Sequence, residues 1–327
     1  MKLLGVLAAT TTALSAKDMF EQWKTDNAKK YQSPKEEQLR FNQWLKNKDF
    51  VDQHMLEYAA GKHTYTVGMN KFADLSGAEF ANLYLSQVSD LRGPHAPMCT
   101  PSSIAANSSV PTSADWRTGG AVTAIKDQGQ CGSCWAFSTI ASLEGQWFLS
   151  GSGPLTSLSE QQLVDCSQNW GNFGCGGGLM DQGFTYIHDI GGVETEADYP
   201  YTAMDGTCAF DSSKAAGHLS SCQDLSSGDE GALQNAIVQI GPISVAIDAS
   251  HMSFQLYQDG VYYEPNCSSQ FLDHGVTAIG YGSDNGSDYF LVKNSWGTGW
   301  GSQGYIKMAR NRQNNCGIAT QASFPQI

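Results

Sequence analysis

The amino-acid composition changes sharply near residue 90 of this 327-residue chain. Up to that point the sequence is charged, rich in helix-forming residues and nearly free of cysteine. Residues 33–60 begin with a Ser-Pro pair and two Glu and then carry apolar residues at helical spacing, which predicts a long helix. Residues 90–114 are rich in Pro, Ser and Ala without periodicity, which predicts an exposed linker that is easily cut. Beyond it, glycine, cysteine and aromatic residues become frequent, as in a compact disulfide-bonded domain.

Charge is distributed unevenly between the two parts. Residues 17–110 carry equal numbers of basic and acidic residues, whereas residues 111–327 carry 7 Lys+Arg and 21 Asp+Glu, a net charge of −14 with His neutral. A domain this acidic does not bind nucleic acid through its net field, so we expect no nucleic-acid partner. Its self-repulsion falls as carboxylates are protonated, which is compatible with an acidic compartment.

The N-terminus has the features of a secretory signal peptide. The stretch MKLLGVLAATTTALSA has an early Lys2, a short apolar run and small residues before Lys17. This pattern predicts a signal peptide over residues 1–16, cut near Ser15 or Ala16; the alternative is an ordinary buried helix. No apolar run approaches 18 residues, so we expect no transmembrane helix. Secretion would place the nine cysteines in an oxidising compartment, and because nine is odd at least one thiol stays unpaired.

Residues 127–138, DQGQCGSCWAFS, contain a C-x-x-C pair formed by Cys131 and Cys134. Such a pair alone is compatible with a redox couple, half a zinc site, or one structural and one reactive cysteine. Zinc is disfavoured because no second C-x-x-C or matching His pair follows, and a redox couple because no βαβ pattern surrounds it. Ser133 is placed to cap a buried helix beginning near Cys134, where the helix dipole favours a thiolate. A nucleophilic Cys134, with Cys131 in a disulfide, accounts for the odd cysteine.

Three segments carry a specific resemblance over nearly the whole chain. QGQCGSCWAFS resembles the active-site segment of papain-like cysteine proteases, LDHGVTAIGYG (272–282) the histidine segment and KNSWGTGWGSQGYIKM (293–308) the asparagine segment. The spacing of the cysteine, histidine and asparagine agrees with the family. GPISVAIDA and CGGGLMD are most similar to the cathepsin L type. A non-proteolytic relative would be expected to lose the nucleophile, and Cys134 is intact.

The resemblance implies a role for each matching residue. Cys134 is expected to be the nucleophile and His274 its thiolate–imidazolium partner, with Asn294 orienting the imidazole. Gln128 is expected to donate its side-chain amide to the oxyanion together with the Cys134 backbone N–H. Trp296 is expected to shield the His274–Asn294 bond from water. No long insertion with paired histidines follows Cys175, which favours endopeptidase action.

The resemblance also implies the cysteine pairing. Cys134 is expected to stay free, and two further cysteines, Cys99 in the linker and Cys222, have no partner in the family pattern. A bond between these two would cross the expected cleavage point, and the sequence leaves open whether they are free or paired. The implied disulfides are Cys131–Cys175, Cys166–Cys208 and Cys267–Cys316.

Residues 17–110 resemble a cathepsin L-type inhibitory propeptide. The helix pattern is carried by Glu36, Arg40, Trp44, Asn47 and Val51, with Met55 standing where Asn is usual, and Gly68-x-Asn70-x-Phe72-x-Asp74 matches the second motif. Such a propeptide runs through the cleft in the reverse sense to substrate. VPTSADWR resembles the start of a mature enzyme, so we expect a cut near Val110–Pro111 and a peptidase domain over residues 111–327. Candidate glycosylation sequons begin at Asn107, Asn266 and Asn285.

The expected fold is α+β: a helical left domain around the Cys134 helix and a β-barrel right domain that contributes His274 and Asn294, preceded by the helical propeptide. The strand-like runs ISVAIDA, GVTAIGYG and DYFLVKNSW support the right domain independently. The resemblance implies protein and peptide substrates, the propeptide as inhibitor, a monomer, and neither cofactor nor metal. The expected location is the secretory pathway, ending in a lysosome or another acidic vacuole or outside the cell.

Alignment with cathepsin L implies the substrate-binding residues. The pocket for the second residue before the scissile bond is expected to be mostly apolar and to favour Leu, Val or Phe. Gln321 departs from the family, which carries a small residue at this point of the pocket floor; a neutral amide there shortens the pocket. The implied set is Gly177, Gly178, Leu179, Met180, Ala246, Leu272, Gly275, Trp296 and Gln321.

Overall fold

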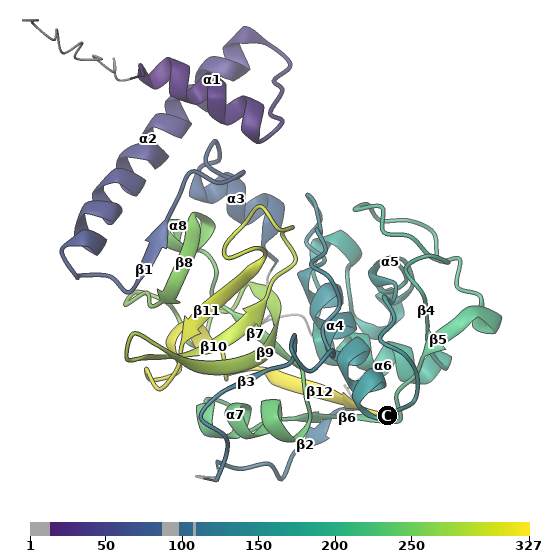
Figure 1. Ribbon diagram of the computed structural model, residues 1–327. Helices are drawn as coiled ribbons and strands as arrows, with labels where there is room; N and C mark the ends of the chain where they lie inside the picture. Colours follow the sequence, from purple (N-terminus) through teal and green to yellow (C-terminus); the bar gives the residue numbers. More distant parts are fainter. Residues whose placement is uncertain (1–13, 87–97, 107–108) are drawn as a thin grey trace, which may run out of the picture.

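The computed structural model describes residues 14–86, 98–106 and 109–327 (Figure 1). The predicted signal peptide over residues 1–16 lies almost wholly outside the described residues, and the sequon at Asn107 lies outside them as well. None of the helices within the described ranges combines the length and the apolar character needed to cross a membrane.

The N-terminal part is helical, as predicted. The helix expected over residues 33–60 is confirmed: it begins after Ser33, whose hydroxyl accepts a hydrogen bond from the Glu36 N–H at 3.2 Å. Asn47 is fully buried and donates from its amide to the carbonyls of Ala73 and Leu75, so the helix holds the following segment in place. The elements of this part are α1 (Ala16–Asp26), α2 (Pro34–Ala59), β1 (Tyr65–Val67) and α3 (Gly77–Tyr84).

A helical half follows the linker. Its central helix α4 begins at Cys134, as predicted, and is buried on most faces. The prediction that the Ser133 side chain caps this helix is wrong. Its hydroxyl instead shares a hydrogen bond with the Tyr201 hydroxyl at 2.6 Å. The elements of this half are α4 (Cys134–Leu149), α5 (Glu160–Cys166), η1 (Gln168–Trp170), η2 (Gly174–Gly176), α6 (Met180–Ile190), β4 (Val193–Glu194), η3 (Ser212–Lys214) and β5 (Ala215–Gly217).

The other half is built on one ten-stranded sheet in the order β1-β8-β11-β10-β9-β7-β12-β6-β2, with β3 paired to β9. The three strand-like runs noted in the sequence form β7, β9 and β10, which confirms them as strands. Helix α4 packs against β9 and β7, so the two halves meet where β9 begins (Figure 1). The elements are β2 (Thr100–Pro101), β3 (Ala114–Asp115), β6 (Ser221–Asp224), α7 (Glu230–Gln239), β7 (Ile243–Ile247), α8 (Met252–Gln255), β8 (Tyr257–Tyr262), β9 (His274–Asp284), β10 (Ser287–Lys293), β11 (Tyr305–Ala309), η4 (Asn315–Gly317) and β12 (Ala322–Gln326).

The segment before residue 110 adds a strand at each end of this sheet. β1 pairs antiparallel with β8, and β2 pairs in parallel with β6. Residues 98–106 of the predicted linker are therefore attached to the sheet, although five of these nine residues are exposed, as predicted: Thr100, Pro101, Ser103, Ala105 and Ala106. Backbone hydrogen bonds to β6 attach this segment, and the sequence did not indicate them because the linker has no periodic apolar pattern.

Candidate active site

Cys134 is the first residue of α4 and is fully buried. Its sulfur lies 3.3 Å from the hydroxyl oxygen of Ser86, a residue of the N-terminal segment. Gly275, at the start of β9, packs closely on this helix end: a Cβ on Gly275 would lie 3.2 Å from the carbonyl oxygen of Cys134. A larger residue at this position would require the helix end or the strand to shift by a few tenths of an ångström.

His274 is the first residue of β9, where it pairs with Ile247 of β7. Its Nε2 lies 2.8 Å from the Asn294 side-chain oxygen, which also accepts the Ser295 backbone N–H at 2.8 Å. Because that oxygen only accepts, Nε2 carries the proton and Nδ1 keeps a lone pair. Nδ1 has no hydrogen-bond partner among the described residues. Trp296 is fully buried and stacks on the imidazole with ring centroids 4.4 Å apart, which places it over the His274–Asn294 pair.

The electrostatics of this site favour neutral groups. Burial raises the pKa of the Cys134 thiol, and this outweighs the lowering effect of the Gly275 N–H and the Ser86 hydroxyl. Burial lowers the pKa of His274 to about 4, against the raising effect of its bond to Asn294. Both shifts favour the neutral thiol and the neutral imidazole in this form of the chain over the ion pair expected of a working site.

Gln128 is fully buried and has every polar atom of its side chain engaged. Its amide nitrogen donates to the carbonyl of Cys131 at 2.8 Å and to that of Tyr84 at 3.2 Å, and Tyr84 belongs to the N-terminal segment. Its side-chain oxygen accepts from the Ser295 hydroxyl at 2.7 Å and from the Trp296 indole N–H at 3.2 Å. A backbone carbonyl of the N-terminal segment thus occupies a donor that we predicted for the oxyanion.

The N-terminal segment also covers the surroundings of these residues. The Ser86 N–H donates to the carbonyl of Asp273 at 2.8 Å, next to His274 in the chain. Trp296 is surrounded by three aromatic rings of the N-terminal segment, at centroid distances of 5.2–6.5 Å: Phe72, Phe80 and Tyr84. The sequence motifs predicted that this segment inhibits the enzyme, but they did not predict the contacts made by Ser86 and by the Tyr84 carbonyl. No motif marks a single serine or a backbone oxygen.

A cavity of about 310 Å³ is lined by three of the residues that the resemblance implied for the substrate pocket. These residues are Leu179, Met180 and Gln321. Of the other residues expected there, Ala246 and Leu272 belong to the apolar core that contains Met180, and the Ala246 N–H donates to the Gln321 carbonyl at 3.0 Å. Gly275 lies opposite Ala246 on β9 and lines a different, small cavity with Asn294.

Two glycines of the CGGGLMD motif lie beside the helix that carries Cys134. Gly177 has a positive φ of 117°. A Cβ on Gly178 would come within 2.6 Å of the Trp135 ring, so the chain can pass over α4 only with glycine at that position. The structure thus packs Gly178 of this motif against Trp135, the residue that follows the nucleophile candidate in α4.

Two carboxyl groups that we did not predict line the same cavity. Asp181 and Asp224 share a hydrogen bond, and burial raises the pKa of both, that of Asp224 to about 7. Asp181 directly follows Met180 in the GGGLMD stretch, but only packing brings β6 and its Asp224 alongside. The pair makes the lining of this cavity more polar than the sequence indicated.

The structure contains four disulfides among the described residues. Three join the pairs that the resemblance implied: Cys131–Cys175, Cys166–Cys208 and Cys267–Cys316. The fourth joins Cys99 to Cys222, the two cysteines left open by the sequence, and Cys134 is the free cysteine. Because Cys131 is bonded to Cys175, the alternative of a Cys131–Cys134 redox couple does not apply to this form.

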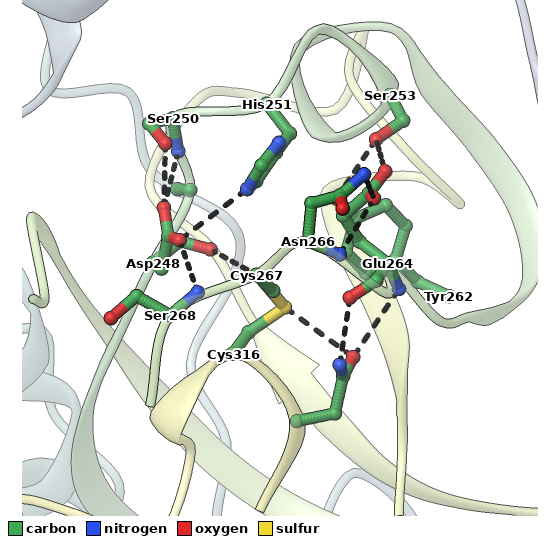
Figure 2. Close-up of a disulfide and its surroundings, with 12 residues drawn as sticks. Asp248, Ser250, His251, Ser253, Tyr262, Glu264, Asn266, Cys267, Ser268 and Cys316 are labelled. Carbon is green, nitrogen blue, oxygen red and sulfur yellow. Dashed lines mark hydrogen bonds and ion pairs between the residues drawn. A yellow bond between two sulfur atoms is a disulfide. The ribbon is translucent and has the colours of Figure 1, made fainter. Parts of the chain in front are cut away.

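Two of the sequons lie at exposed positions. Figure 2 shows Asn266 beside the Cys267–Cys316 disulfide, where its backbone and side-chain nitrogens both donate to Glu264. Asn285 lies in the tight turn between β9 and β10 with a φ of 49°. Both groups of potential metal ligands in the described residues, Asp248–His251–Cys267 and Cys99–Asp181–Asp224, include a disulfide-bonded cysteine and so offer no thiolate.

Comparison with known proteins places these observations in a family. Residues 110–326 match the papain family cysteine protease model, and residues 20–80 match the cathepsin propeptide inhibitor domain. The chain is 48% identical to a cathepsin L-like peptidase of Aedes aegypti and 47% identical to digestive cysteine proteinase 2 of Homarus americanus, in both cases over 100% of each protein. Its structure is similar to that of digestive procathepsin L 3 from the larval midgut of Tenebrio molitor, with a TM-score of 0.87, 45% identity, and coverage of 96% of this chain and 100% of that one. The chain therefore belongs to the papain family of cysteine proteases and is a cathepsin L-like peptidase in its proenzyme form.

Proposed function

We propose that this proenzyme matures into an endopeptidase that cleaves peptide bonds with Cys134 as nucleophile and His274 as its acid–base partner. The observation that carries the proposal is the fixed His274–Asn294 pair at the start of β9, packed against the end of α4 that bears the free cysteine. His274 Nδ1, the ring nitrogen that Asn294 leaves unused, takes the thiol proton and later gives it to the leaving amine. Water then hydrolyses the thioester and regenerates Cys134.

In this proposal Gln128 stabilises the oxyanion. Its amide nitrogen loses the Tyr84 carbonyl when the N-terminal segment leaves, and it then has a free N–H for the substrate oxygen beside the Cys134 backbone N–H. Departure of the segment also lets water reach Cys134 and His274, and this removes the burial that holds both neutral. The thiolate–imidazolium pair forms at that stage.

Alkylation of the acid-treated protein with a thiol-reactive epoxide tests the proposed class. We expect one label per molecule, on Cys134, with complete loss of peptide cleavage, because the other eight cysteines are in disulfides. Peptide mass mapping of the labelled chain is the measurement. A label elsewhere, or labelled protein that still cleaves peptides, would exclude Cys134 as the nucleophile.

We propose residues 1–16 as the signal peptide, residues 17–110 as the inhibitory propeptide, and residues 111–327 as the peptidase, with a cut near Val110–Pro111. The enzyme would then travel the secretory pathway as a monomer and act in an acidic vacuole or outside the cell. Asn285, at an exposed turn, is the sequon best placed for a glycan, whereas the Asn266 amide already binds Glu264.

Specificity is expected to depend on Gln321. The pocket favours an apolar side chain at the second position before the cut by roughly 1.5–3 kcal/mol for full burial. The Gln321 amide shortens the pocket and needs a polar partner that Phe does not supply, so we expect Leu or Val over Phe. Gln321 brings no charge, and the Asp181–Asp224 pair loses charge on acidification, so acid should not create a preference for Arg.

Values of kcat/KM for peptides that differ only at this position, in wild type and Gln321→Ala, measure this expectation. Gln321→Ala should gain most for Phe. A wild-type preference for Phe over Leu that the substitution leaves unchanged would show that the amide lies outside the pocket.

Acid is expected to loosen the propeptide through His54. This side chain is buried in α2, its Nε2 donates to the Tyr65 carbonyl at 3.0 Å, and its ring stacks on His63 at 4.0 Å. Burial lowers the pKa of His54, so the folded propeptide favours the neutral imidazole. As the pH falls below about 6.5, His54 is protonated in the unfolded propeptide before it is protonated in the folded one. The folded propeptide therefore loses stability in that range.

Proteolytic sensitivity of the propeptide between pH 7 and 5 measures this effect, in a Cys134→Ser background that cannot process itself. His54→Gln keeps a donor for Tyr65 and removes the titration, so its sensitivity should rise less on acidification. Equal profiles with and without the His54→Gln substitution would assign the acid response to other groups.

A further inference from the structure

The Cys99–Cys222 disulfide joins positions 123 residues apart and crosses the proposed cleavage point at Val110–Pro111. Cys99 lies on the propeptide side of that point and Cys222 lies on β6 of the peptidase domain. Cleavage of the linker therefore breaks the chain without separating its two parts. The zymogen mechanism proposed above gives this disulfide no role.

Residues around Cys99 are seated on the peptidase domain by further contacts. Thr100 and Pro101 pair with Gln223 and Asp224 of β6, and the Ser102 N–H donates to the Asp224 carbonyl at 2.8 Å. Upstream, the Met98 N–H donates to the Thr185 hydroxyl of α6 at 3.1 Å. Downstream, the Asn235 amide of α7 donates to the Ala105 carbonyl at 2.7 Å. Residues 98–106 thus form an edge strand and its flanks on the enzyme, although the sequence assigns them to the propeptide.

We propose that Cys222 is a covalent, reducible attachment site that keeps the propeptide on the peptidase domain after the linker is cut, so that full activation requires reduction as well as proteolysis. The inference rests on the proposed cut at Val110–Pro111. The inhibitory contacts made by Tyr84 and Ser86 lie only 13 residues or so upstream of Cys99. A tethered inhibitor this close rebinds as an intramolecular ligand, at an effective concentration on the order of millimolar.

Release follows ordinary thiol–disulfide exchange. Cys222 is fully buried and Cys99 is half-buried, so in this proposal the incoming thiolate attacks the sulfur of Cys99 rather than that of Cys222. A bond forms between that thiolate and Cys99, the Cys99–Cys222 bond breaks, and Cys222 leaves as a thiolate that takes up a proton. The second thiol of a dithiol then displaces Cys99 as a free thiol; the dithiol is oxidised to a disulfide and the protein disulfide is reduced.

The covalent link is tested without any catalysis by this chain. A full-length Cys134→Ser protein, with residues 107–110 replaced by the recognition sequence of an added protease, is cut at pH 7, denatured, alkylated and weighed. Without reductant we expect one species with the mass of the whole chain plus one water. After treatment with a dithiol we expect two separate chains.

The matched control carries Cys99→Ser and Cys222→Ser in the same background and should give two chains without reductant. Two chains from the parent protein without reductant would overturn the proposal, whether or not the control folds. Because the added protease makes the cut, failure of this test says nothing against the proposed peptidase activity, and failure of that activity leaves this test intact.

The effect on latency is measured in the same design with Cys134 restored. We expect the cut, unreduced protein to hydrolyse a peptide at pH 7 at least tenfold more slowly than the cut Cys99→Ser/Cys222→Ser control. A dithiol should abolish this difference, and treating the control identically accounts for any effect of reductant on Cys134 itself. Equal rates before reduction, in protein shown by mass to be linked, would overturn the regulatory role.

Discussion

Cys134→Ser is expected to fold and to retain its four disulfides but to lose peptide hydrolysis by roughly 10⁴-fold or more, as removal of a nucleophile does in hydrolases that use a triad. Serine fits because its hydroxyl is smaller than the thiol that it replaces, whose sulfur already lies within hydrogen-bond distance of the Ser86 hydroxyl. Its hydroxyl has no pKa near that of the imidazole, so His274 cannot prepare a nucleophile from it.

His274→Ala should cost nearly as much, and Asn294→Ala clearly less. Without Asn294 the imidazole loses its Nε2 acceptor and part of its orientation, but Trp296 still stacks on it at 4.4 Å. Values of kcat/KM for the three variants, on protein processed by an added protease, measure the order. A larger loss from Asn294→Ala than from His274→Ala would contradict the roles proposed here.

The full-length protein is expected to be inactive at neutral pH and to process itself when acidified. The Tyr84 carbonyl holds the Gln128 donor and Ser86 lies against Cys134, so neither is open to substrate. Acid weakens the propeptide because the pKa of Glu79 is lowered: burial opposes this shift, but hydrogen bonds from Ser76 and the Arg40 guanidinium outweigh it. Stability from that carboxylate is present above its unfolded pKa near 4.3 and is lost as the pH falls through its lower folded value.

Phe80→Ala is expected to break latency at pH 7. Phe80 is fully buried, with its ring edge-on to Trp296 at 5.2 Å, and truncation of a buried Phe costs about 3–5 kcal/mol. Part of this cost falls on the contact with the peptidase domain, so epoxide labelling of Cys134 in the uncut chain should accelerate roughly 10- to 100-fold. Leu39→Ala, at a 61% exposed position of α2, is the matched control and should label like wild type.

Labelling rates must be read on chains that gels show to be intact, since processed enzyme would also react. Unprocessed wild type that labels or hydrolyses peptides at the full rate at pH 7 would overturn the inhibitory assignment. Phe80→Ala that stays as latent as Leu39→Ala would instead place the blockade elsewhere in the segment.

Local features of the sequence were sufficient for much of the structure. The capped start of α2 at Ser33 and the strands β7, β9 and β10 follow from spacing, because a side chain's face is fixed by the period of its own helix or strand. The family segments likewise pointed to Cys134, His274 and Asn294, and the structure joins the last two by a hydrogen bond. What those residues do together in the active form remains a proposal.

Tertiary structure alone decided the features that depend on segments distant in the chain. The pairing of Cys99 with Cys222 required β2 to lie along β6, and no local pattern in a Pro- and Ser-rich stretch predicts which strand edge it will join. The pKa shifts of Cys134 and His274 towards their neutral forms depend on burial, which is a property of packing. The sequence by itself thus determined the chemical groups of this peptidase, and the folded proenzyme determined what covers them, because burial and pairing are set by neighbours in space rather than along the chain.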